Sequence, residues 1–336
     1  MSSSDVSSDA PIAEEPPGQQ QLPPQRAAVE PLDPQLTTIQ PGGGVCMRIE
    51  LAWGYVRRFL LKTLFPGYVA RMAKLRRGST NCCPWEVLDP RDVKFHRNQP
   101  GYWWAAEDDP FTWRDHLPFV RAGLAELFLI GGMFLTLAVV AGWFWIWASV
   151  PFVVLTLLVM WFFRNPRRIA PTEPGLVISP ADGLVVSCTE LPGDSFIQGP
   201  VMEIGIFLSV FDVHINRTPV AARVIGMTYF RGKFLNALLP ASARENEQLA
   251  VRLEENEAPY RRFVVRQIAG AIARRIVCWV APGEELTRGA AFGMIKFGSR
   301  TEILMQQDPD LELLVKPGDR VRAGVTVLAR YKNASS

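Results

Sequence analysis

The feature that most constrains this chain is a stretch of 37 residues, 127–163, without a single charged side chain. One continuous helix of that length would extend about 55 Å, well beyond the ~30 Å hydrocarbon core of a bilayer. Pro151 lies a little past the middle of the stretch and lacks the backbone donor that a continuous helix needs. We therefore expect two short apolar helices, with a break between residues 142 and 151.

Positive charges flank the apolar stretch on both sides. Arg121 precedes it, and Arg164, Arg167 and Arg168 follow it. Because Lys and Arg concentrate on the cytoplasmic side of membrane segments, both ends are expected on that side. The pattern predicts a helical hairpin over residues 122–163 in the cell (cytoplasmic) membrane, with the C-terminal part of the chain facing the cytoplasm. Full spanning and shallow re-entry both stay open.

The first 121 residues divide into two parts by composition. Residues 1–45 are rich in Ser, Pro and Gln and offer little apolar surface to offset the entropy of ordering, so we predict disorder. Residues 46–121 interleave basic with aromatic and aliphatic side chains. This pattern fits a helix at the surface of anionic lipid as well as a solvated basic helix docked on its own domain.

Residues 164–336 have the pattern of a mainly β domain. Short apolar runs separated by Gly and Pro predict strands at 176–178, 184–186, 201–208, 263–265 and 276–280. A helical pattern is confined to about residues 241–255, and residues 315–328 look like the paired hairpin of lipoyl-type sandwiches. The predicted fold class is α+β, a mainly β domain with a lipoyl-like sandwich hairpin after the membrane hairpin and the disordered N-terminus.

Charge and cysteine usage argue against several classes of protein. The formal net charge of +3 is too small to indicate a nucleic-acid partner. The five cysteines are odd in number and scattered, without Cys-x-x-Cys or metal-type spacing. We therefore expect neither a disulfide framework nor a zinc site.

A serine, a histidine and an aspartate in the C-terminal part form a candidate constellation. Ser299 directly follows Gly298, and Asp182 and His214 lie upstream. A histidine with a pKa near ~6.5 can take the proton of a serine hydroxyl, and a carboxylate on its far ring nitrogen can orient it. Glycine allows a strained turn and does not shield its own carbonyl, so Ser299 can attack the carbonyl of Gly298.

Each of these residues also has a plain structural interpretation. A lone histidine beside Phe211 and Val213 is more often a satisfied core residue, and the Asp-Gly pair at Asp182 commonly marks a β-turn. Asp212 competes with Asp182 for orienting His214. Two residues apart on a strand, Asp212 and His214 would share a face without being forced into contact.

Seven ordered segments resemble the phosphatidylserine decarboxylases, specifically their short, mostly bacterial branch. The resemblance covers about half of the chain, from residue 162 to 328. The segments are 163–168 (FRNPRR), 179–183 (SPADG), 211–217 (FDVHINR), 232–237 (GKFLNA), 245–247 (ENE), 273–277 (ARRIV) and 297–300 (FGSR). Residues 1 to about 120 have no counterpart in this short family.

The resemblance implies an enzyme that decarboxylates phosphatidylserine to phosphatidylethanolamine. Its cofactor would be a pyruvoyl group that the chain makes by cutting itself between Gly298 and Ser299, and neither a metal nor pyridoxal phosphate is implied. Ser299 would be the nucleophile, His214 the base and Asp182 the acid that orients it. Residues 1–298 and 299–336 would stay together as a heterodimer, and a higher oligomer is left open.

The headgroup of the implied substrate carries a phosphate and a carboxylate, which suit Arg or Lys. The candidate headgroup residues are Arg217, Lys233, Arg274 and Arg275, with Asn236 as a neutral donor. Ordinary surface charge is the alternative for at least half of them.

Three other functions stay open at this stage. They are a decarboxylase of another serine phospholipid such as an ether lipid, a non-enzymatic membrane-anchored module with a lipoyl-like scaffold, and a membrane serine protease. No lysine lies at the tip of an obvious Asp-Lys hairpin, which argues against a lipoyl carrier. A protease would cut other proteins, whereas a self-cleaving Gly-Ser site predicts one cut in its own chain.

Overall fold

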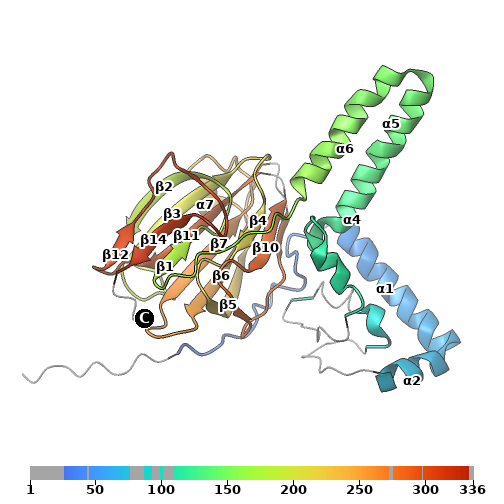
Figure 1. Cartoon of the computed structure of the whole chain (residues 1–336). Helices are drawn as coiled ribbons and strands as arrows, with labels where there is room; N and C mark the ends of the chain where they lie inside the picture. Colours follow the sequence, from blue (N-terminus) through green and yellow to red (C-terminus); the bar gives the residue numbers. More distant parts are fainter. Residues whose placement is uncertain are drawn as a thin grey trace, which may run out of the picture.

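The computed structural model describes residues 26–43, 45–75, 87–92, 99–100, 109–271, 275–296 and 298–332. Figure 1 shows a β domain on one side and a group of helices on the other. The α-helices are α1 (Val45–Leu64), α2 (Pro66–Leu75), α4 (Leu124–Glu126), α5 (Gly132–Phe144), α6 (Val150–Phe162) and α7 (Ser242–Glu245). Short 3-10 or π turns lie at Pro90–Asp92, Thr112–His116, Arg121–Gly123, Leu127–Gly131 and Ile146–Ser149.

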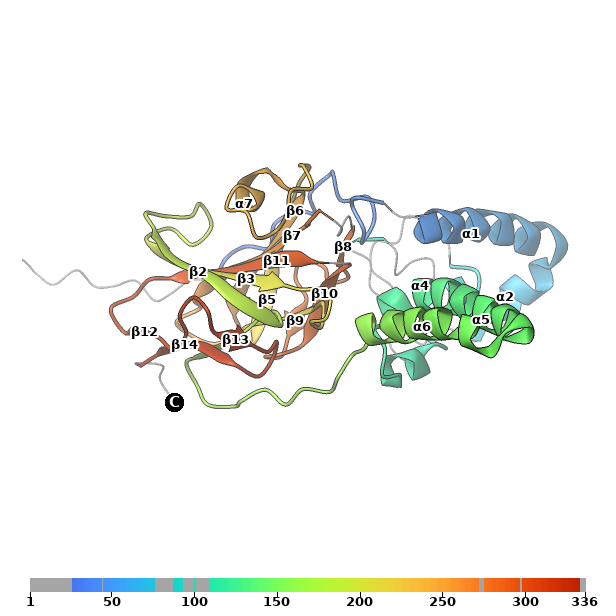
Figure 2. The ribbon, with the colours of Figure 1, turned by 90° about the horizontal axis from the view of Figure 1, so that it is seen from above.

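Helices α5 and α6 form a hairpin that projects away from the β domain (Figures 1 and 2). The chain turns at Trp145, whose backbone is extended, and Pro151 lies in the first turn of α6, where a missing N–H costs nothing. The break therefore falls between residues 142 and 151, where the sequence predicts it. Among the described residues, Arg121–Phe144 forms a helix of 24 residues that is long and apolar enough to cross a membrane.

The strands of the described residues build one large sheet and two small ones. Their bounds are β1 Leu176–Ile178, β2 Gly183–Leu191, β3 Val201–Leu208, β4 Ile215–Arg217, β5 Ala222–Phe230, β6 Gln248–Glu255, β7 Arg262–Ile268, β8 Arg275–Cys278, β9 Glu285–Leu286, β10 Ala291–Lys296, β11 Ser299–Gln306, β12 Leu311–Leu313, β13 Arg320–Val321 and β14 Val327–Tyr331. The large sheet has the order β13-β2-β3-β11-β7-β6-β5-β9, and the small sheets have the orders β1-β14-β12 and β4-β10-β8.

The register of the large sheet gathers several loops at one end of the domain. Strand β11 begins at Ser299, which pairs with Leu208 at the end of β3. Arg300 pairs with Ile268 at the end of β7, and Ile268 pairs in turn with the first residue of β6. That first residue of β6 also pairs with Phe230, the last residue of β5. The loops after β3, β5 and β7 therefore emerge beside Ser299. We call this the site end of the sheet.

The core has two main parts. The larger fills the inside of the curled sheet, with Ile204, Val251, Phe263 and Ile303 fully buried. The second joins the base of the helical hairpin to the β4-β10-β8 sheet, because Phe162 and Phe163 pack there with Val213, Ile215 and Met294. The hairpin is thus rooted in the domain beside the segment that carries His214.

The mainly β domain is confirmed, and three finer expectations differ from the structure. Residues 315–328 do not form a paired lipoyl-type hairpin, because β13 pairs with β2 whereas β14 pairs with β1 and β12. Helix is confined to Ser242–Glu245 within the predicted 241–255, since Gln248–Glu255 is strand β6, whose apolar residues alternate toward the core.

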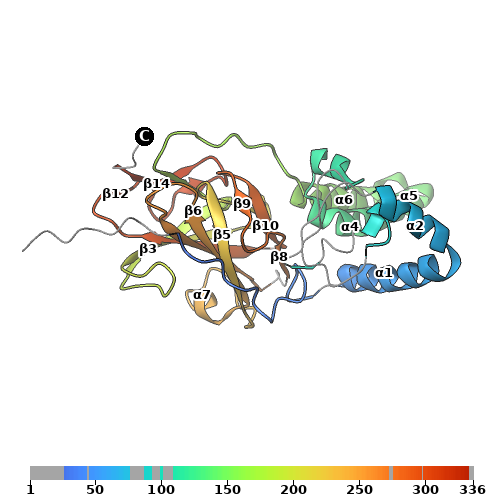
Figure 3. The same ribbon diagram turned by 90° about the horizontal axis from the view of Figure 1, so that it is seen from below.

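The third difference concerns the N-terminal segment predicted to be disordered over 1–45. Its described part, residues 26–43, lies along the sheet as a strap (Figure 3). The N–H of Glu30 donates to the carbonyl of Ile225 at 2.8 Å, and Leu36 and Ile39 are buried. Two apolar side chains and a few backbone hydrogen bonds fix a segment whose composition alone indicates disorder.

Candidate active site

The Gly298–Ser299 peptide lies where β11 begins. Gly298 has a φ of +64°, in the left-handed region that glycine adopts without steric cost. Ser299 is fully buried between β3 and β7. Its hydroxyl has no hydrogen-bond partner among the described residues, although a buried polar group left unpaired costs roughly 1–3 kcal/mol.

His214 lies directly against this peptide. Its Nε2 accepts a hydrogen bond from the N–H of Gly298 at 3.0 Å, and its Nδ1 lies 2.9 Å from the backbone carbonyl of Asp212. Because a carbonyl only accepts, Nδ1 carries the proton and Nε2 holds a lone pair toward Gly298. Burial lowers the pKa of His214 to about 4, so the ring is neutral at physiological pH.

The structure brings His214 to the Gly298–Ser299 peptide but does not bring Asp182 to His214. The Asp182 carboxylate accepts hydrogen bonds from Arg168 at 2.8 Å and from the N–H of Ala323 at 2.7 Å. Burial raises its pKa, against the opposing effect of these two donors. Asp182 thus ties the segment after the hairpin to the turn after β13.

The competing carboxylate, Asp212, does not reach the ring either. It accepts hydrogen bonds from the N–H and the hydroxyl of Ser209, at 2.8 and 2.7 Å, and fixes the loop before His214. The group that orients His214 in this structure is the main-chain carbonyl of Asp212. Sequence reasoning considered side chains only, and a carbonyl carries no sequence signature.

Gly270 is a site residue that sequence reasoning missed. The register of β7 and β11, continued by two residues, sets it opposite Gly298. A Cβ atom at Gly270 would lie 2.4 Å from the carbonyl oxygen of Gly298, well inside van der Waals contact. The carbonyl next to Ser299 can take this position only because residue 270 has no side chain.

A buried polar ladder continues from the site into the domain. Asn216 donates to the hydroxyl of Thr301 at 3.0 Å and accepts from Gln267 at 2.9 Å. The two segments therefore contact each other at two points, His214 with Gly298 and Asn216 with Thr301. Asn216 stands in the 211–217 segment, and only the tertiary structure reveals its partner.

The predicted headgroup residues have different surroundings. Arg217 is held by Asn165 and by the carbonyl of Gly289, both at 3.0 Å, so it fastens the segment after the hairpin. Lys233 is exposed and paired with Glu245, and Asn236 caps the following turn through Leu238. Arg275 lies in β8, and Arg274 lies outside the described residues.

Both legs of the helical hairpin contact the segments that carry the site. The buried Lys296, two residues before Gly298, forms an ion pair with Glu126 at the base of the first leg. On the second leg, the indole of Trp161 donates to the carbonyl of Phe211 at 3.1 Å, and Arg164 donates to the same carbonyl at 2.8 Å.

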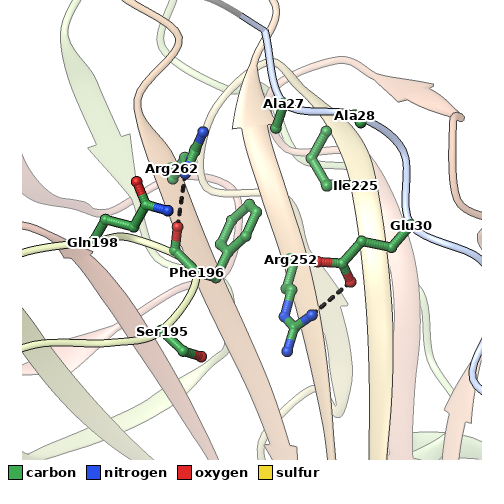
Figure 4. Close-up of a pocket in the computed structure, with 9 residues that line it drawn as sticks. All are labelled: Ala27, Ala28, Glu30, Ser195, Phe196, Gln198, Ile225, Arg252 and Arg262. Carbon is green, nitrogen blue, oxygen red and sulfur yellow. Dashed lines mark hydrogen bonds and ion pairs between the residues drawn. The ribbon is translucent and has the colours of Figure 1, made fainter.

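A cavity of about 270 Å³ lies at the opposite end of the sheet (Figure 4). Its two arginines are already engaged, Arg252 with Glu30 and Arg262 with the carbonyl of Phe196. Arg262 is the first residue of β7, whereas the far end of that strand contacts the start of β11. This cavity is separate from the Ser299 site.

Comparison with known proteins identifies the class of enzyme. Residues 155–329 match the family model described as phosphatidylserine decarboxylase. A protein of Rhodopirellula baltica named phosphatidylserine decarboxylase proenzyme is 53% identical over 240 residues, which cover 71% of this chain and 99% of the relative. Proteins of the same name are 49% identical in Symbiobacterium thermophilum, covering 52% of this chain and 80% of the relative, and 42% identical in Nitrosomonas eutropha, covering 66% and 96%.

These matches make the protein a carboxy-lyase of phospholipid biosynthesis. The chain belongs to the phosphatidylserine decarboxylase family. The expectation drawn from the seven segments is thereby confirmed. The family match covers the site region. The alignment with the Rhodopirellula baltica protein covers 71% of the chain and therefore reaches into the first 120 residues, so the expectation that residues 1 to about 120 have no counterpart is wrong for part of that segment.

Proposed function

We propose that this protein decarboxylates phosphatidylserine to phosphatidylethanolamine after cutting its own chain between Gly298 and Ser299. The observation that carries the proposal is the buried hydroxyl of Ser299, which has no hydrogen-bond partner in the part of the chain that the structure describes. It lies next to a left-handed glycine whose N–H contacts a neutral histidine. The residues fit a pyruvoyl group derived from Ser299, since this residue begins a strand held on both sides by β3 and β7.

In the first step the Ser299 Oγ adds to the carbonyl carbon of Gly298. His214 takes the hydroxyl proton at Nε2 and gives it to the amide nitrogen as the C–N bond breaks, which leaves an ester. Loss of the Ser299 Cα proton then breaks the Cβ–Oγ bond and releases the Gly298 carboxylate. Water adds to the resulting dehydroalanine and ammonia leaves, so residue 299 becomes the pyruvoyl group.

In the decarboxylation itself the pyruvoyl group supplies an electron sink for the electrons of the breaking carbon–carboxylate bond. His214, with its proton on Nδ1 and a lone pair on Nε2, holds and returns the proton that the product carbon requires. Lys233, Asn236 and Arg275 near the site end are candidates for the headgroup phosphate and carboxylate, and Arg274 stays a sequence-based candidate. The half-buried Arg217 is instead engaged with Asn165 and the carbonyl of Gly289.

We propose a positioning role for Asp182. Its carboxylate fixes Arg168 and the turn at Ala323, and both lie close to the segment that Arg217 holds. It thereby keeps the chain after the hairpin in place against the domain. It acts on the reacting groups only through this packing.

We also propose that the two chains stay together and that the protein sits in the cytoplasmic membrane with its β domain in the cytoplasm. Strand β11 pairs along its length with β3 and β7, which supports a stable heterodimer of 1–298 and 299–336. The apolar hairpin between basic flanks supports insertion. On α1, exposed apolar residues recur at helical spacing (Val45, Ile49, Trp53, Val56, Leu60 and Leu64), which supports a helix at the lipid surface.

The test is the intact mass of the purified protein beside its Ser299→Ala variant, followed by assays on phosphatidylserine and on a serine ether phospholipid. We expect two chains, 1–298 and 299–336, the shorter blocked by a pyruvoyl group, and one uncut, inactive chain for the variant. A single active wild-type chain would refute the pyruvoyl proposal. Equal rates on both lipids would extend the substrate class to serine phospholipids in general.

A further inference from the structure

We propose that the site end carries an apolar rim, made of Val210, Phe211, Phe230, Leu238 and Leu239, which inserts into the lipid surface and contacts the acyl chains of the substrate. The inference rests on the proposed role of Ser299, because the rim flanks the Gly298–Ser299 peptide. It adds a lipid contact made by the catalytic domain itself, apart from the helical hairpin.

The rim residues are exposed although they are large and apolar. Phe211 is 63% exposed, Leu238 51%, and Leu239 and Phe230 50% each. Exposing such side chains to water is unfavourable by roughly 25 cal/mol for each Å² of apolar surface. Single exposed apolar residues are ordinary, but a group at one end of a sheet marks an interaction surface.

The register and the contacts bring these residues together around the scissile peptide. Val210 and Phe211 follow β3, whose last residue pairs with Ser299, and a Cβ atom at Gly298 would lie 3.8 Å from Val210 Cγ1. On the other side, Gly270 lies under the Gly298 carbonyl, and a Cβ there would be 3.4 Å from the Cβ of Ala237.

Leu238 and Leu239 directly follow Ala237, in the loop between β5 and α7. Phe230 is the last residue of β5. The strand pairing places it in the same row across the sheet as Arg300, the residue after Ser299. Exposed apolar side chains therefore flank the Gly298–Ser299 peptide from two sides.

Two observations indicate a bilayer as the occupant. The rim is continuous with the base of the apolar hairpin, because Trp161 donates to the carbonyl of Phe211. The exposed Arg231 and Lys233, the latter paired with Glu245, lie in the loop that runs from the end of β5 at Phe230 to Leu238, so apolar and positive groups alternate as they do in surfaces that bind anionic lipid. The family's substrate has two acyl chains, which need an apolar surface when the headgroup reaches Ser299.

The test uses the full-length protein in proteoliposomes and a variant that carries Leu238→Ser and Leu239→Ser. One assay supplies long-chain phosphatidylserine in the same bilayer. The other supplies dihexanoyl phosphatidylserine as a soluble monomer to phosphatidylcholine proteoliposomes. Leu314→Ser is the matched control, because Leu314 is also half exposed and follows β12, on the side of the domain away from the hairpin (Figure 1).

We expect the double variant to lose about tenfold or more in kcat/KM on the long-chain lipid and to keep the wild-type kcat on the short-chain lipid. Pyruvoyl content should equal that of wild type, and the Leu314→Ser control should behave as wild type in both assays. Unchanged activity on the long-chain lipid would overturn the proposal, as would an equal loss on both lipids. A change in oligomeric state with equal losses would show that the rim covers a second copy of the chain.

The same preparation separates this inference from the proposed function. An uncut wild-type chain without a pyruvoyl group would refute the proposed role of Ser299 as the reactive residue. If the wild type is cut and active and the double variant has the same activity, only the proposal of the apolar rim is refuted.

Discussion

The N–H of Gly298 donates a hydrogen bond to Nε2 of His214 at 3.0 Å, while the hydroxyl of Ser299 has no partner among the described residues. The lone pair that would take the serine proton is therefore occupied by the residue on the other side of the scissile bond. Under the proposed self-cleavage, this hydrogen bond has to open before His214 can take the proton of Ser299.

The pH dependence of self-cleavage should report the low pKa of His214. Burial lowers this pKa to about 4, so the neutral base is fully present from pH 8 down to about 5. The rate of cutting, followed by gel after synthesis into nanodiscs, should stay flat over that range. A titration with its midpoint near the ordinary histidine value of ~6.5 would contradict this prediction.

The imidazole of His214 should also make the uncut protein less stable in acid. Its folded-state pKa lies below the unfolded value of ~6.5, so the unfolded chain takes up the proton first. The histidine contribution to stability is therefore complete above pH 6.5 and is lost as the pH falls toward 4. Unfolding of the Ser299→Ala protein by denaturant, compared with a Ser299→Ala/His214→Gln double variant, measures it. An equal acid dependence in both would assign the loss to other groups.

Substitution of Asp182 and Asp212 should show whether either carboxylate orients His214 or only holds the surrounding chain in place. Asp182→Asn keeps the shape of a side chain bonded to Arg168 and Ala323, so we expect self-cleavage to slow by about tenfold or less, with an unchanged pH profile. Asp212→Asn keeps the carbonyl that orients His214 and should cut within a few-fold of the wild-type rate. Removing the charge from a carboxylate that orients a catalytic histidine costs about 10⁴-fold. A loss of that size at either position would identify it as the orienting acid.

Gly270→Ala should block presentation of the Gly298 carbonyl. The added Cβ would lie 2.4 Å from that oxygen, a main-chain atom that cannot move without the scissile peptide. We expect self-cleavage at least about tenfold slower, with normal activity per pyruvoyl group in the fraction that matures. Gly226→Ala is the control, because the nearest atoms to its Cβ belong to the side chain of Glu30, with a carboxylate oxygen at 2.1 Å and the Glu30 Cβ at 3.0 Å, and not to a main chain. Wild-type cutting by Gly270→Ala would show that the carbonyl is presented in another position.

Glu126→Gln should destabilise the junction between the hairpin and the site. The side chain of Lys296 is only 3% exposed, and losing its charge partner leaves a buried ammonium group, at a cost of about 3 kcal/mol. Glu245→Gln, which breaks the exposed pair with Lys233, should leave the free energy of unfolding nearly unchanged, because water screens that pair. Chemical unfolding in detergent, followed by tryptophan fluorescence, compares the two. Replacing the pair together, by Lys296→Met and Glu126→Leu, should restore most of the loss.

Much of the domain could be predicted from local pattern. The strand over 201–208 matches its predicted bounds, because its apolar run needs only a sheet to bury it. The run over 248–255 also forms a strand, against the predicted helix, because its pairing with β5 and β7 outweighs a charged sequence that suits a helix equally well. The strap at Leu36 was missed for a similar reason, since a few long-range contacts outweigh composition.

By itself the sequence determined the family and the apolar hairpin, and it named Ser299 and His214 as candidates, because those features are written in residue types and in their spacing along the chain. Only the tertiary structure decided that a carbonyl orients the histidine, that Asp182 binds Arg168, and that Gly270 lies under the reactive carbonyl. These relationships depend on strand register and on main-chain atoms. Every residue carries the same main-chain groups, so their positions become specific only when distant strands pair.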